Sequence, residues 1–376
     1  MAELSPSRKL GFGFLRLPLL NEDDPASIDY EKTSEMVDLF LSQGFCYFDT
    51  AYNYHKELSE IGIREALVKR HSRNSFLLAD KMPTFYVTKR EDFDRFFQEQ
   101  LDRCGVDYFD FYLLHNLGQE RYGNMTRLGA FEFMKKIKAE GNAGEIGFSF
   151  HDTAETLDRI LTEHPEMDFV QLQLNYIDWE SESIQSRKCY EVARKHGKPI
   201  TVMEPVKGGA LARLSPEAEK PLKAFAPGSS NASWAIRYAA SLDGVRMVLS
   251  GMSDLKQVRD NTGYMKDFQK LNSEEQKRIA QVVDILKRSQ SIQCTNCKYC
   301  MDECPMNINI PGYFAFYNSA AQQDNFIDML YTRVSHGHGQ PWDCIGCRSC
   351  EGHCPQHLPI TDYLKTISEY VKEKVL

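Results

Sequence analysis

Residues 294–305 read CTNCKYCMDECP, and residues 344–355 read CIGCRSCEGHCP. Both segments follow the pattern C-x2-C-x2-C-x3-C-P, and they lie 50 residues apart. At the same offset, the apolar residues that follow the cysteines also correspond: Ile308 to Leu358, Ile310 to Ile360 and Tyr313 to Tyr363. The C-terminal part of the chain therefore contains an internal repeat that extends beyond the cysteines themselves.

This cysteine spacing is one that bacterial ferredoxins use to ligate iron–sulfur clusters. A cubane cluster needs four thiolates, and one tight loop supplies three of them. In two-cluster ferredoxins the fourth cysteine of each run ligates the other cluster. The spacing therefore predicts two 4Fe–4S clusters with exchanged fourth ligands: Cys294, Cys297, Cys300 and Cys354 for cluster 1, and Cys344, Cys347, Cys350 and Cys304 for cluster 2.

Zinc and disulfides are the alternative uses of such cysteines. A structural zinc site usually takes paired C-x2-C units, and a disulfide framework is typical of small secreted chains. Neither explains a run of four cysteines that ends in Cys-Pro. Between the two runs, residues 312–333 have a helical pattern. We therefore expect residues 291–376 to form a small, mainly helical ferredoxin-like domain.

Composition places the chain among ordinary soluble proteins. It has 376 residues, 42% of them hydrophobic and 26% charged, and a formal net charge of −8. That charge argues against a surface for nucleic acid. No signal peptide is evident, and no apolar run approaches the ~20 residues of a membrane span. Eleven cysteines without an export signal predict a reducing, cytoplasmic location.

Residues 1–270 alternate short apolar segments with amphipathic ones, which predicts repeated strand–helix units. Eight such units in about 260 residues match the (β/α)8 TIM barrel in number and size. A doubly wound sheet is the alternative, but its G-x-G-x-x-G fingerprint is absent. A helix at 271–290 is expected to connect the barrel to the C-terminal domain. The predicted strands are 10–17, 46–49, 76–81, 109–115, 145–149, 169–175, 199–204 and 245–250.

Four polar residues lie at or just after predicted strand ends, where TIM barrels carry catalytic groups. Asp49, Lys81 and His115 end the second, third and fourth strands, and Tyr54 follows five residues after Asp49. Singly, each has a structural explanation as a helix cap, a surface charge, a rim aromatic or a packed histidine. Together they predict proton donation from Tyr54 to a carbonyl. Lys81 would lower the pKa of Tyr54, Asp49 would hold Lys81, and His115 would orient the carbonyl oxygen.

With these four residues and their surroundings, the sequence resembles the aldo/keto reductases, whose Asp–Tyr–Lys–His tetrad matches Asp49, Tyr54, Lys81 and His115. The likeness covers about residues 9–268, and the two cysteine runs extend it to the ferredoxin-fused branch of the family. It implies hydride transfer between a nicotinamide nucleotide and a carbonyl substrate. The segments that carry it are GFGFLRLP (11–18), GFCYFDTAYNY (44–54), LLADKMP (77–83) and FYLLHN (111–116).

The resemblance also implies a nucleotide bound across the barrel mouth. Ser149 and Gln171 would hydrogen-bond its carboxamide, and Met203 stands where many members stack a tyrosine on the nicotinamide. Phe150 stands where many members have asparagine. The remaining expected contacts are Gly13 and Arg16 beside the first strand, Gly208 and Gly209 at the pyrophosphate, and Gly251, Ser253, Gln257 and Asn261 at the adenosine end.

The expected cofactors are two 4Fe–4S clusters and NADP(H) or NAD(H), with a flavin as an alternative. A nicotinamide passes a hydride, whereas a cubane normally passes single electrons. Electron transfer between the clusters and the barrel site is the favoured interpretation. The alternatives are a carbonyl reductase with structural or redox-sensing clusters, a flavin-dependent electron-transfer enzyme, and a non-enzymatic electron carrier. We expect a small carbonyl or enone substrate, an electron-transfer protein as a candidate partner, and no nucleic acid or membrane.

Overall fold

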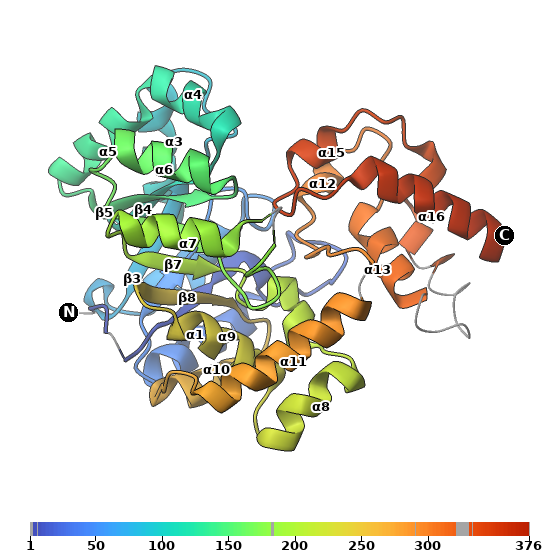
Figure 1. Cartoon of the computed structure of the whole chain (residues 1–376). Coiled ribbons are helices and arrows are strands. Elements are labelled where there is room, and N and C mark those ends of the chain that lie inside the picture. The colour runs from blue at the N-terminus through green and yellow to red at the C-terminus, as the bar shows by residue number, and fades with distance from the viewer. Residues whose placement is uncertain are drawn as a thin grey trace.

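Eight parallel strands form a closed barrel in the computed structural model (Figure 1). The described residues are 3–5, 7–181, 184–289, 291–320, 331–332 and 334–375. Each strand pairs with the next along the chain, and β8 pairs with β1, which excludes the doubly wound sheet. The strands are β1 (Leu10–Gly13), β2 (Tyr47–Asp49), β3 (Leu77–Met82), β4 (Phe109–Leu117), β5 (Ala143–Phe150), β6 (Phe169–Gln173), β7 (Ile200–Met203) and β8 (Val245–Gly251).

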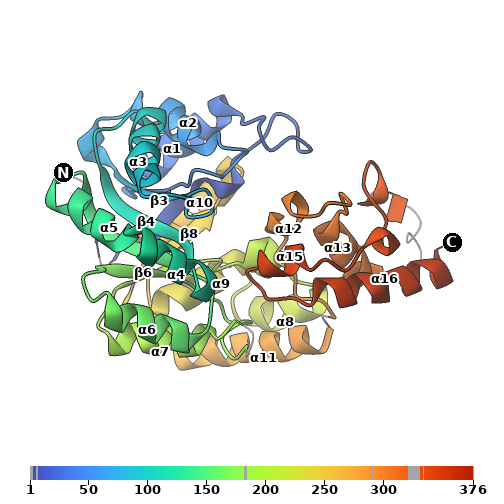
Figure 2. The same ribbon diagram turned by 90° about the horizontal axis from the view of Figure 1, so that it is seen from above.

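Helices surround the barrel, as the view from above shows (Figure 2). Side-chain caps begin several of them: Asp29, Thr153 and Ser230 each accept a hydrogen bond from the backbone N–H three residues further on. The helices of this part are α1 (Tyr30–Ser42), α2 (Ser59–Ile63), α3 (Glu91–Cys104), α4 (Gln119–Leu128), α5 (Ala130–Ala139), α6 (Ala154–Glu163), α7 (Ser186–Lys195), α8 (Pro216–Phe225), α9 (Asn231–Ser241), α10 (Leu255–Lys266) and α11 (Ser273–Ser289).

The bounds of several elements differ from the sequence prediction. The first predicted strand ends early, because residues Phe14–Arg16 turn into a short 3-10 helix. Helices α4 and α8 were not predicted. Helix α8 begins at the capping side chain of Ser215, and it buries Ala218 and Leu222 in a cluster shared with α11. The residues of α11 that it contacts lie more than 50 residues further along the sequence, so no local sequence pattern predicts the contact.

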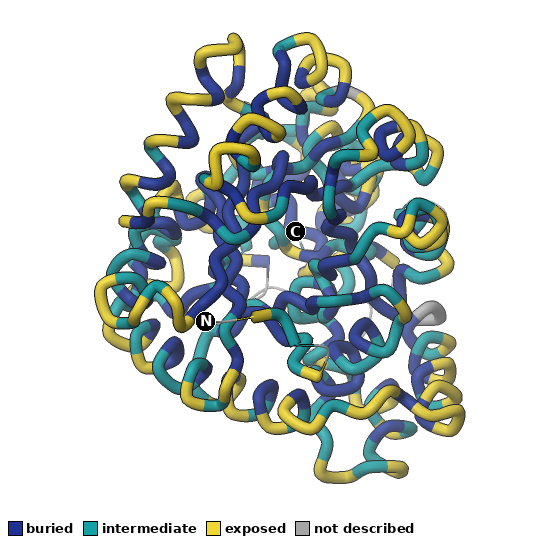
Figure 3. The backbone as a smooth tube through the Cα atoms, turned by 90° about the vertical axis from the view of Figure 1, so that its left-hand side faces the viewer, coloured by how far each residue is buried: buried dark blue, intermediate teal, exposed yellow. Residues whose placement is uncertain are grey.

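Side chains alternate between the inner and outer faces of the strands, so the barrel has two hydrophobic cores. The inner faces of the strands form one cluster, and their outer faces pack against the helices in a second, larger one. Figure 3 shows buried residues in the strands and on the inward sides of the helices. The inner cluster consists of Tyr47, Leu77, Ala79, Phe111, Leu113, Phe169, Met247 and Leu249. Asp49, Lys81, His115 and Gln171 continue these inward rows two residues further on, at the C-terminal mouth of the barrel.

The C-terminal module has a core of its own and repeats its structure. Helices α12 (Tyr299–Asp302) and α13 (Ile310–Ala320) correspond, 50 residues on, to α15 (Ser349–Gly352) and α16 (Ile360–Lys374). The backbone repeats as well, since Asn307 and His357 have positive φ angles of 50° and 48°. The predicted helix at 312–333 is confirmed up to residue 320, whereas 321–330 and 333 lie outside the described residues.

The module lies across the mouth of the barrel (Figures 1 and 2). The buried Lys207 Nζ donates to the carboxylate of Asp178 in the barrel and to Gln356 Oε1 of the module at 3.2 Å. The His357 imidazole Nε2 lies 3.1 Å from the carbonyl oxygen of His151. These contacts fix the cysteine loops over the strand ends. Among the described helices, none is long and apolar enough to cross a membrane.

Candidate active site

Asp49, Tyr54, Lys81 and His115, here called the tetrad, come together at the barrel mouth. Lys81 Nζ lies 2.6 Å from Asp49 Oδ1 and 2.6 Å from the Thr50 carbonyl oxygen, and its side chain is fully buried. The same Nζ lies 4.9 Å from the centre of the Tyr54 ring. The rings of Tyr54 and His115 meet edge to face at 5.9 Å. Three strands and one loop therefore converge on the Tyr54 phenol.

The electrostatics of Tyr54 differ from the sequence prediction. Burial, followed by the charges of Asp49 and Glu204, raises the pKa of Tyr54 well above its ordinary value. Lys81 was expected to lower it. Burial and these carboxylates outweigh the charge of the Lys81 ammonium group, which lies over the ring face and forms an ion pair with Asp49. In the free protein, Tyr54 therefore keeps its proton at neutral pH, as a proton donor must.

His115 is buried in its neutral form. Burial and the neighbouring Lys81 hold the pKa of His115 well below its usual value. Its Nδ1 is buried without a hydrogen-bond partner, while its carbonyl oxygen accepts from the hydroxyl of Thr84 at 2.5 Å. A buried polar atom without a partner is costly. His115 can therefore gain a hydrogen bond from a ligand oxygen or hydroxyl group beside Tyr54.

A buried polar network behind β3 holds Lys81 in place. The Gln100 amide donates to the Lys81 carbonyl oxygen at 3.0 Å and to Glu60 at 2.9 Å, and Tyr112 donates to Gln100. The backbone N–H of Lys81 donates to Asp80 at 2.8 Å. Burial, followed by the charge of Glu60, raises the pKa of Asp80 well above its ordinary value. The sequence prediction missed this network, which lies on the outer face of the strand.

A cavity of ≈ 2300 Å³ opens between the barrel mouth and the C-terminal module. It contains Asp49, Tyr54 and His115 on the barrel side. Pockets that bind one drug-sized ligand measure about 300–1,000 Å³, so this cavity has room for a nucleotide and a substrate together. All eleven residues assigned to the nucleotide by resemblance line it: Gly13, Arg16, Ser149, Gln171, Met203, Gly208, Gly209, Gly251, Ser253, Gln257 and Asn261.

The side chains around the expected carboxamide position offer free hydrogen-bonding capacity. Gln171 Oε1 is buried without a partner, and Gln171 Nε2 lies 3.6 Å from the sulfur of Met203. The Ser149 hydroxyl accepts from the backbone N–H of Asn116 at 2.7 Å. Phe150, by contrast, packs in the core between strands and helices. It therefore cannot make the contact expected of the asparagine that many family members have at this position. The barrel mouth therefore presents a free acceptor, Gln171 Oε1, to which a primary amide of a ligand could donate a hydrogen bond.

At the expected adenosine end, three of the assigned side chains already bond within the protein. Asn261 donates to Ser250 at 2.9 Å and accepts from the hydroxyl of Tyr264 at 2.7 Å. The Gln257 side chain accepts from the backbone N–H of Ser253 at 2.9 Å. These side chains shape the cavity wall, and a nucleotide contact from them requires an exchange of hydrogen bonds.

Gly208 has a neighbour that the sequence prediction missed. Its φ angle is +63°, and a methyl group placed on it would lie 1.8 Å from the carbonyl oxygen of Thr295. Thr295 immediately follows Cys294, so the first cysteine loop packs directly on the Gly208 backbone. Position 208 therefore has to be glycine, because the first cysteine loop of the module leaves no space for a side chain there. Gly208 was expected to admit a pyrophosphate, and this face of it is already covered by protein.

The cysteine loop also supplies part of the cavity wall. Cys297 and Tyr299 line the cavity together with Tyr54 and Glu204. Burial raises the pKa of Tyr299 well above its ordinary value, and the neighbouring Tyr54 raises it further. The position of Tyr299 next to Cys300 in the sequence was a signal of proximity to a cluster, but not of proximity to the tetrad.

The cysteines of each run lie beside one another and beside one or more cysteines of the other run. Burial raises the pKa of the Cys300 thiol, and its neighbours in decreasing order of effect are Cys297, Cys294, Cys354 and Cys350. Burial likewise raises the pKa of Cys350 to about 12, and its cysteine neighbours are Cys304, Cys344 and Cys347. A fourth cysteine from the other run thus lies beside each group of three.

The surroundings of the second group suit a cluster. Cys304, Cys344, Cys347 and Cys350 line a small cavity whose other walls include Ile308, Ile310 and Leu364. Soft thiolates in an apolar shell are the donor set that iron–sulfur clusters use. Within the described ranges, no three cysteine, histidine, aspartate or glutamate side chains are already arranged around a metal position. The ligand sets therefore rest on neighbourhood and donor chemistry.

Family models match both parts of the chain. The model of the aldo/keto reductase family matches residues 9–284, and that of the 4Fe-4S dicluster domain matches residues 293–358. The morphine 6-dehydrogenase of Pseudomonas putida is 32% identical over 154 residues, which are 39% of this chain and 47% of that protein. The chain thus spans about half the length of this curated relative.

Solved structures share the barrel. An aldo-keto reductase from Klebsiella pneumoniae in complex with NADPH is 19% identical, with a TM-score of 0.59, over 73% of this chain and 90% of that one. The holo form of an aldo-keto reductase from Bacillus halodurans is 23% identical, with a TM-score of 0.58, over 73% and 91%. At these identities the likeness is one of fold.

Proposed function

The chain belongs to the aldo/keto reductase family, and on that premise we propose that it reduces a carbonyl group at Tyr54 with NADPH or NADH. We further propose that two 4Fe–4S clusters in its C-terminal module exchange electrons with the same site. The observation that carries this proposal is the shared cavity, because Asp49, Tyr54 and His115 line the same space as the first cysteine loop.

The tetrad residues have separate roles in this proposal. A bound nicotinamide supplies or accepts a hydride at the carbonyl carbon. Tyr54 gives its phenol proton to the carbonyl oxygen, and Lys81 stabilises the phenolate that remains. Asp49 holds the Lys81 ammonium at 2.6 Å. Because Lys81 is fully buried, its charge acts in a low-dielectric environment, where it stabilises an anion more strongly than it would in water.

The neighbouring residues orient the reactants. His115 is neutral, so its free Nδ1 can hydrogen-bond the carbonyl oxygen or the product hydroxyl. Gln171 and Ser149 would hold the carboxamide of the nicotinamide. Lys256 and Arg259 line the cavity at the expected adenosine end, which supports a basic contact for the 2′-phosphate of NADP(H). We propose Met203 as the apolar surface beneath the nicotinamide ring.

The position of the clusters supports electron transfer rather than a purely structural role. Cys297 of cluster 1 lines the active-site cavity. Cys347, assigned to cluster 2, is exposed. A bound cluster passes single electrons. A path therefore leads from the surface to the tetrad, and an electron-transfer protein is the partner that we propose for its outer end.

Substituting Tyr54→Phe tests the tetrad. General acid catalysis contributes about 10²–10⁴-fold, so the reduction rate of a model aldehyde should fall by that factor. NADPH binding, measured by fluorescence titration, should stay the same. Tyr52→Phe is the matched control, because the Tyr52 hydroxyl bonds Glu99 at 2.9 Å and does not line the cavity. Unchanged turnover in Tyr54→Phe would reject the proposed role.

Anaerobic spectroscopy tests the electronic contact. The purified protein should show broad cluster absorbance and no flavin bands. Addition of NADPH with substrate should change the cluster absorbance during turnover if the two sites exchange electrons. Turnover without any change in cluster absorbance would favour the alternative in which the clusters are structural or redox-sensing.

A further inference from the structure

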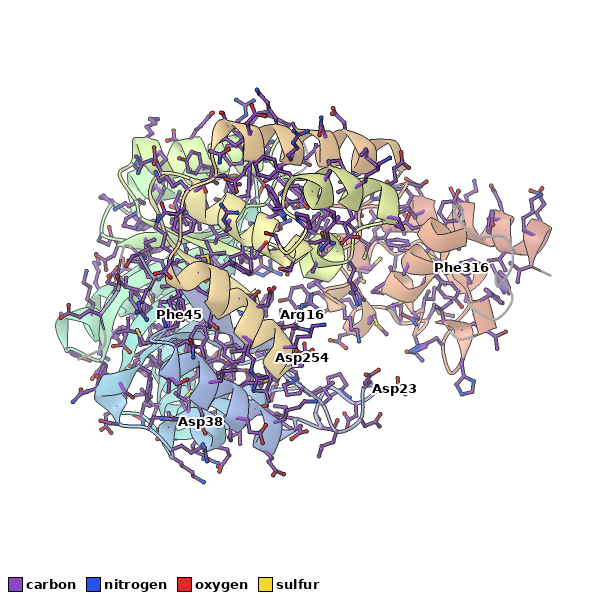
Figure 4. The ribbon with its side chains drawn as sticks, turned by 90° about the horizontal axis from the view of Figure 1, so that it is seen from below. Arg16, Asp23, Asp38, Phe45, Asp254 and Phe316 are labelled. Atoms are coloured by element: carbon purple, nitrogen blue, oxygen red, sulfur yellow. The ribbon has the colours of Figure 1, made fainter. Side chains whose placement is uncertain are left out.

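Arg16 reaches from the end of β1 into the active-site cavity. The short helix Phe14–Arg16 directs it there, and Ser253 bonds the Arg16 carbonyl oxygen at 2.8 Å. Its side chain crosses Gly251, since a methyl group placed on that glycine would lie 3.2–3.3 Å from Cβ, Cγ and Cδ of Arg16. Figure 4 labels Arg16 on the side of the barrel that faces the C-terminal module.

The guanidinium of Arg16 is left without an anionic partner. Its Nη2 is buried and donates no hydrogen bond to the protein, and within the part of the chain that the structure describes Arg16 forms no ion pair. A buried donor without an acceptor is costly. Three other half-buried arginines of the barrel are paired: Arg73 with Asp110, Arg103 with Glu60 and Arg246 with Glu145.

Arg16 lines the same cavity as Tyr54, the proposed proton donor. The charge of Arg16 also acts on the phenol, because it lowers the pKa of Tyr54 against the larger effect of burial. An anion bound at Arg16 would therefore lie within the reach of a small molecule whose carbonyl group contacts Tyr54.

The cofactor phosphates are a second source for such an anion, and the structure favours the substrate. The pyrophosphate was expected at Gly208, next to which Arg16 Nη2 lies, at 3.3 Å from a methyl group placed on that glycine. The carbonyl oxygen of Thr295 already occupies this face of Gly208. The Nη2 side of the guanidinium is therefore covered by protein, and Arg16 meets the cavity that Tyr54 lines through its other atoms.

We propose that Arg16 binds a carboxylate of the substrate, so that the enzyme reduces an aldehyde or ketone that also carries a carboxylic acid. This inference rests on the proposed carbonyl reduction. A hydride from NAD(P)H adds to the carbonyl carbon and the Tyr54 proton adds to the oxygen, which gives a hydroxy acid and NAD(P)+. The carboxylate itself is unchanged. Planar, bidentate donation is the geometry that arginine offers to a carboxylate.

The charge of Glu204 disfavours substrates that carry more than one carboxylate. Its Oε2 is buried without a partner in the same cavity, and it is close enough to raise the pKa of Tyr54. A second carboxylate on the substrate would meet this negative charge. A monocarboxylate with a hydrogen-bond donor at its other end should therefore bind better than a dicarboxylate.

The test compares 4-carboxybenzaldehyde with its methyl ester, two aldehydes that differ in one charge. With wild-type enzyme, the acid should have a KM at least tenfold below that of the ester. Arg16→Gln should raise the KM of the acid at least tenfold and leave that of the ester unchanged, and Arg16→Lys should have an intermediate effect. Lys56→Gln is the control for charge alone, because Lys56 lies at the cavity rim with 67% of its side chain exposed.

Binding measurements separate this inference from the proposed function. By calorimetry, 4-(hydroxymethyl)benzoate, the product of reducing 4-carboxybenzaldehyde, should bind at least tenfold more weakly to Arg16→Gln than to wild type, whether or not either aldehyde is turned over. NADPH should bind both proteins equally. Equal affinity of this hydroxy acid for both proteins would overturn the inference. Weaker NADPH binding with an unchanged preference for the acid would also overturn it, and would assign Arg16 to a cofactor phosphate. Absence of turnover with retained, Arg16-dependent binding would count against the carbonyl reduction alone.

Discussion

Replacement of Lys81 by methionine should destabilise the barrel by leaving a buried carboxylate without its cation. Lys81 Nζ lies 2.6 Å from Asp49 Oδ1, both side chains are buried, and Asp49 Oδ2 already lacks a partner. Removal of one member of a buried ion pair costs about 3–5 kcal/mol. Protonation of Asp49 instead costs about 1.4 kcal/mol per pH unit above its unfolded pKa of ~3.9, or about 5 kcal/mol at pH 7.5. Both routes give a loss of similar size.

The pH dependence identifies the cause. Burial raises the pKa of Asp49, and Lys81 opposes that rise, so the substitution raises this pKa further. A carboxyl group whose folded pKa lies above its unfolded value is stabilised as the pH falls. Between pH 7.5 and pH 6.0, Lys81→Met should therefore regain up to about 2 kcal/mol relative to wild type.

Urea unfolding of the intact chain, followed by tryptophan fluorescence, measures these differences under anaerobic conditions. The fully buried Trp234 reports on the barrel. The double variant Asp49→Asn, Lys81→Met removes the charge together with its partner, and should recover at least about 2 kcal/mol at pH 7.5 while remaining inactive. A double variant as unstable as Lys81→Met, or a loss that does not change with pH, would refute the reasoning.

Two further predictions concern the clusters and the module interface. The double variant Cys297→Ser, Cys354→Ser should keep about four iron atoms per chain, because both substitutions remove ligands of cluster 1 only. The double variant Cys297→Ser, Cys304→Ser removes one ligand from each cluster and should lose most of its iron. Equal iron contents in the two variants would contradict the exchanged fourth ligands. Burial lowers the pKa of His151 to about 4, so the unfolded chain, with a pKa of ~6.5, binds the proton more tightly. Stability should therefore fall as the pH drops from 6.5 towards 4, and at pH 5.5 His151→Gln should remove up to about 1.4 kcal/mol of that loss in urea titrations.

The cysteine module is the part of the fold that local sequence describes best. Ligand spacing is a property of a single tight loop, and the 50-residue offset repeats each loop together with its following helix. The repeat reaches the backbone, where Asn307 and His357 both take the left-handed conformation. The assignment of the fourth ligand to the other loop also follows from this symmetry, and Cys354 and Cys304 indeed lie beside the opposite groups.

The barrel was predictable in order and number, but less so in the bounds of its elements. Period-two alternation marks the inward rows, which is why Asp49, Lys81 and His115 could be assigned to one end of the barrel. Where a strand stops depends on its partners. The first strand ends at Gly13, where the chain turns into the 3-10 helix Phe14–Arg16 that directs Arg16 towards the cavity. Helix α8 depends on packing against α11, which no local pattern records.

The sequence by itself determined the eight strand–helix units, the two cysteine loops and the residue types at the barrel mouth. Spacing and alternation are enough for these, because they depend on near neighbours along the chain. Only the tertiary structure decided that Thr295 covers Gly208, that Arg16 is left without an anion, and that Tyr54 holds its proton more tightly than usual. These properties depend on burial and on charges brought together from distant segments, and the strength of an electrostatic interaction depends on how far water is excluded around it.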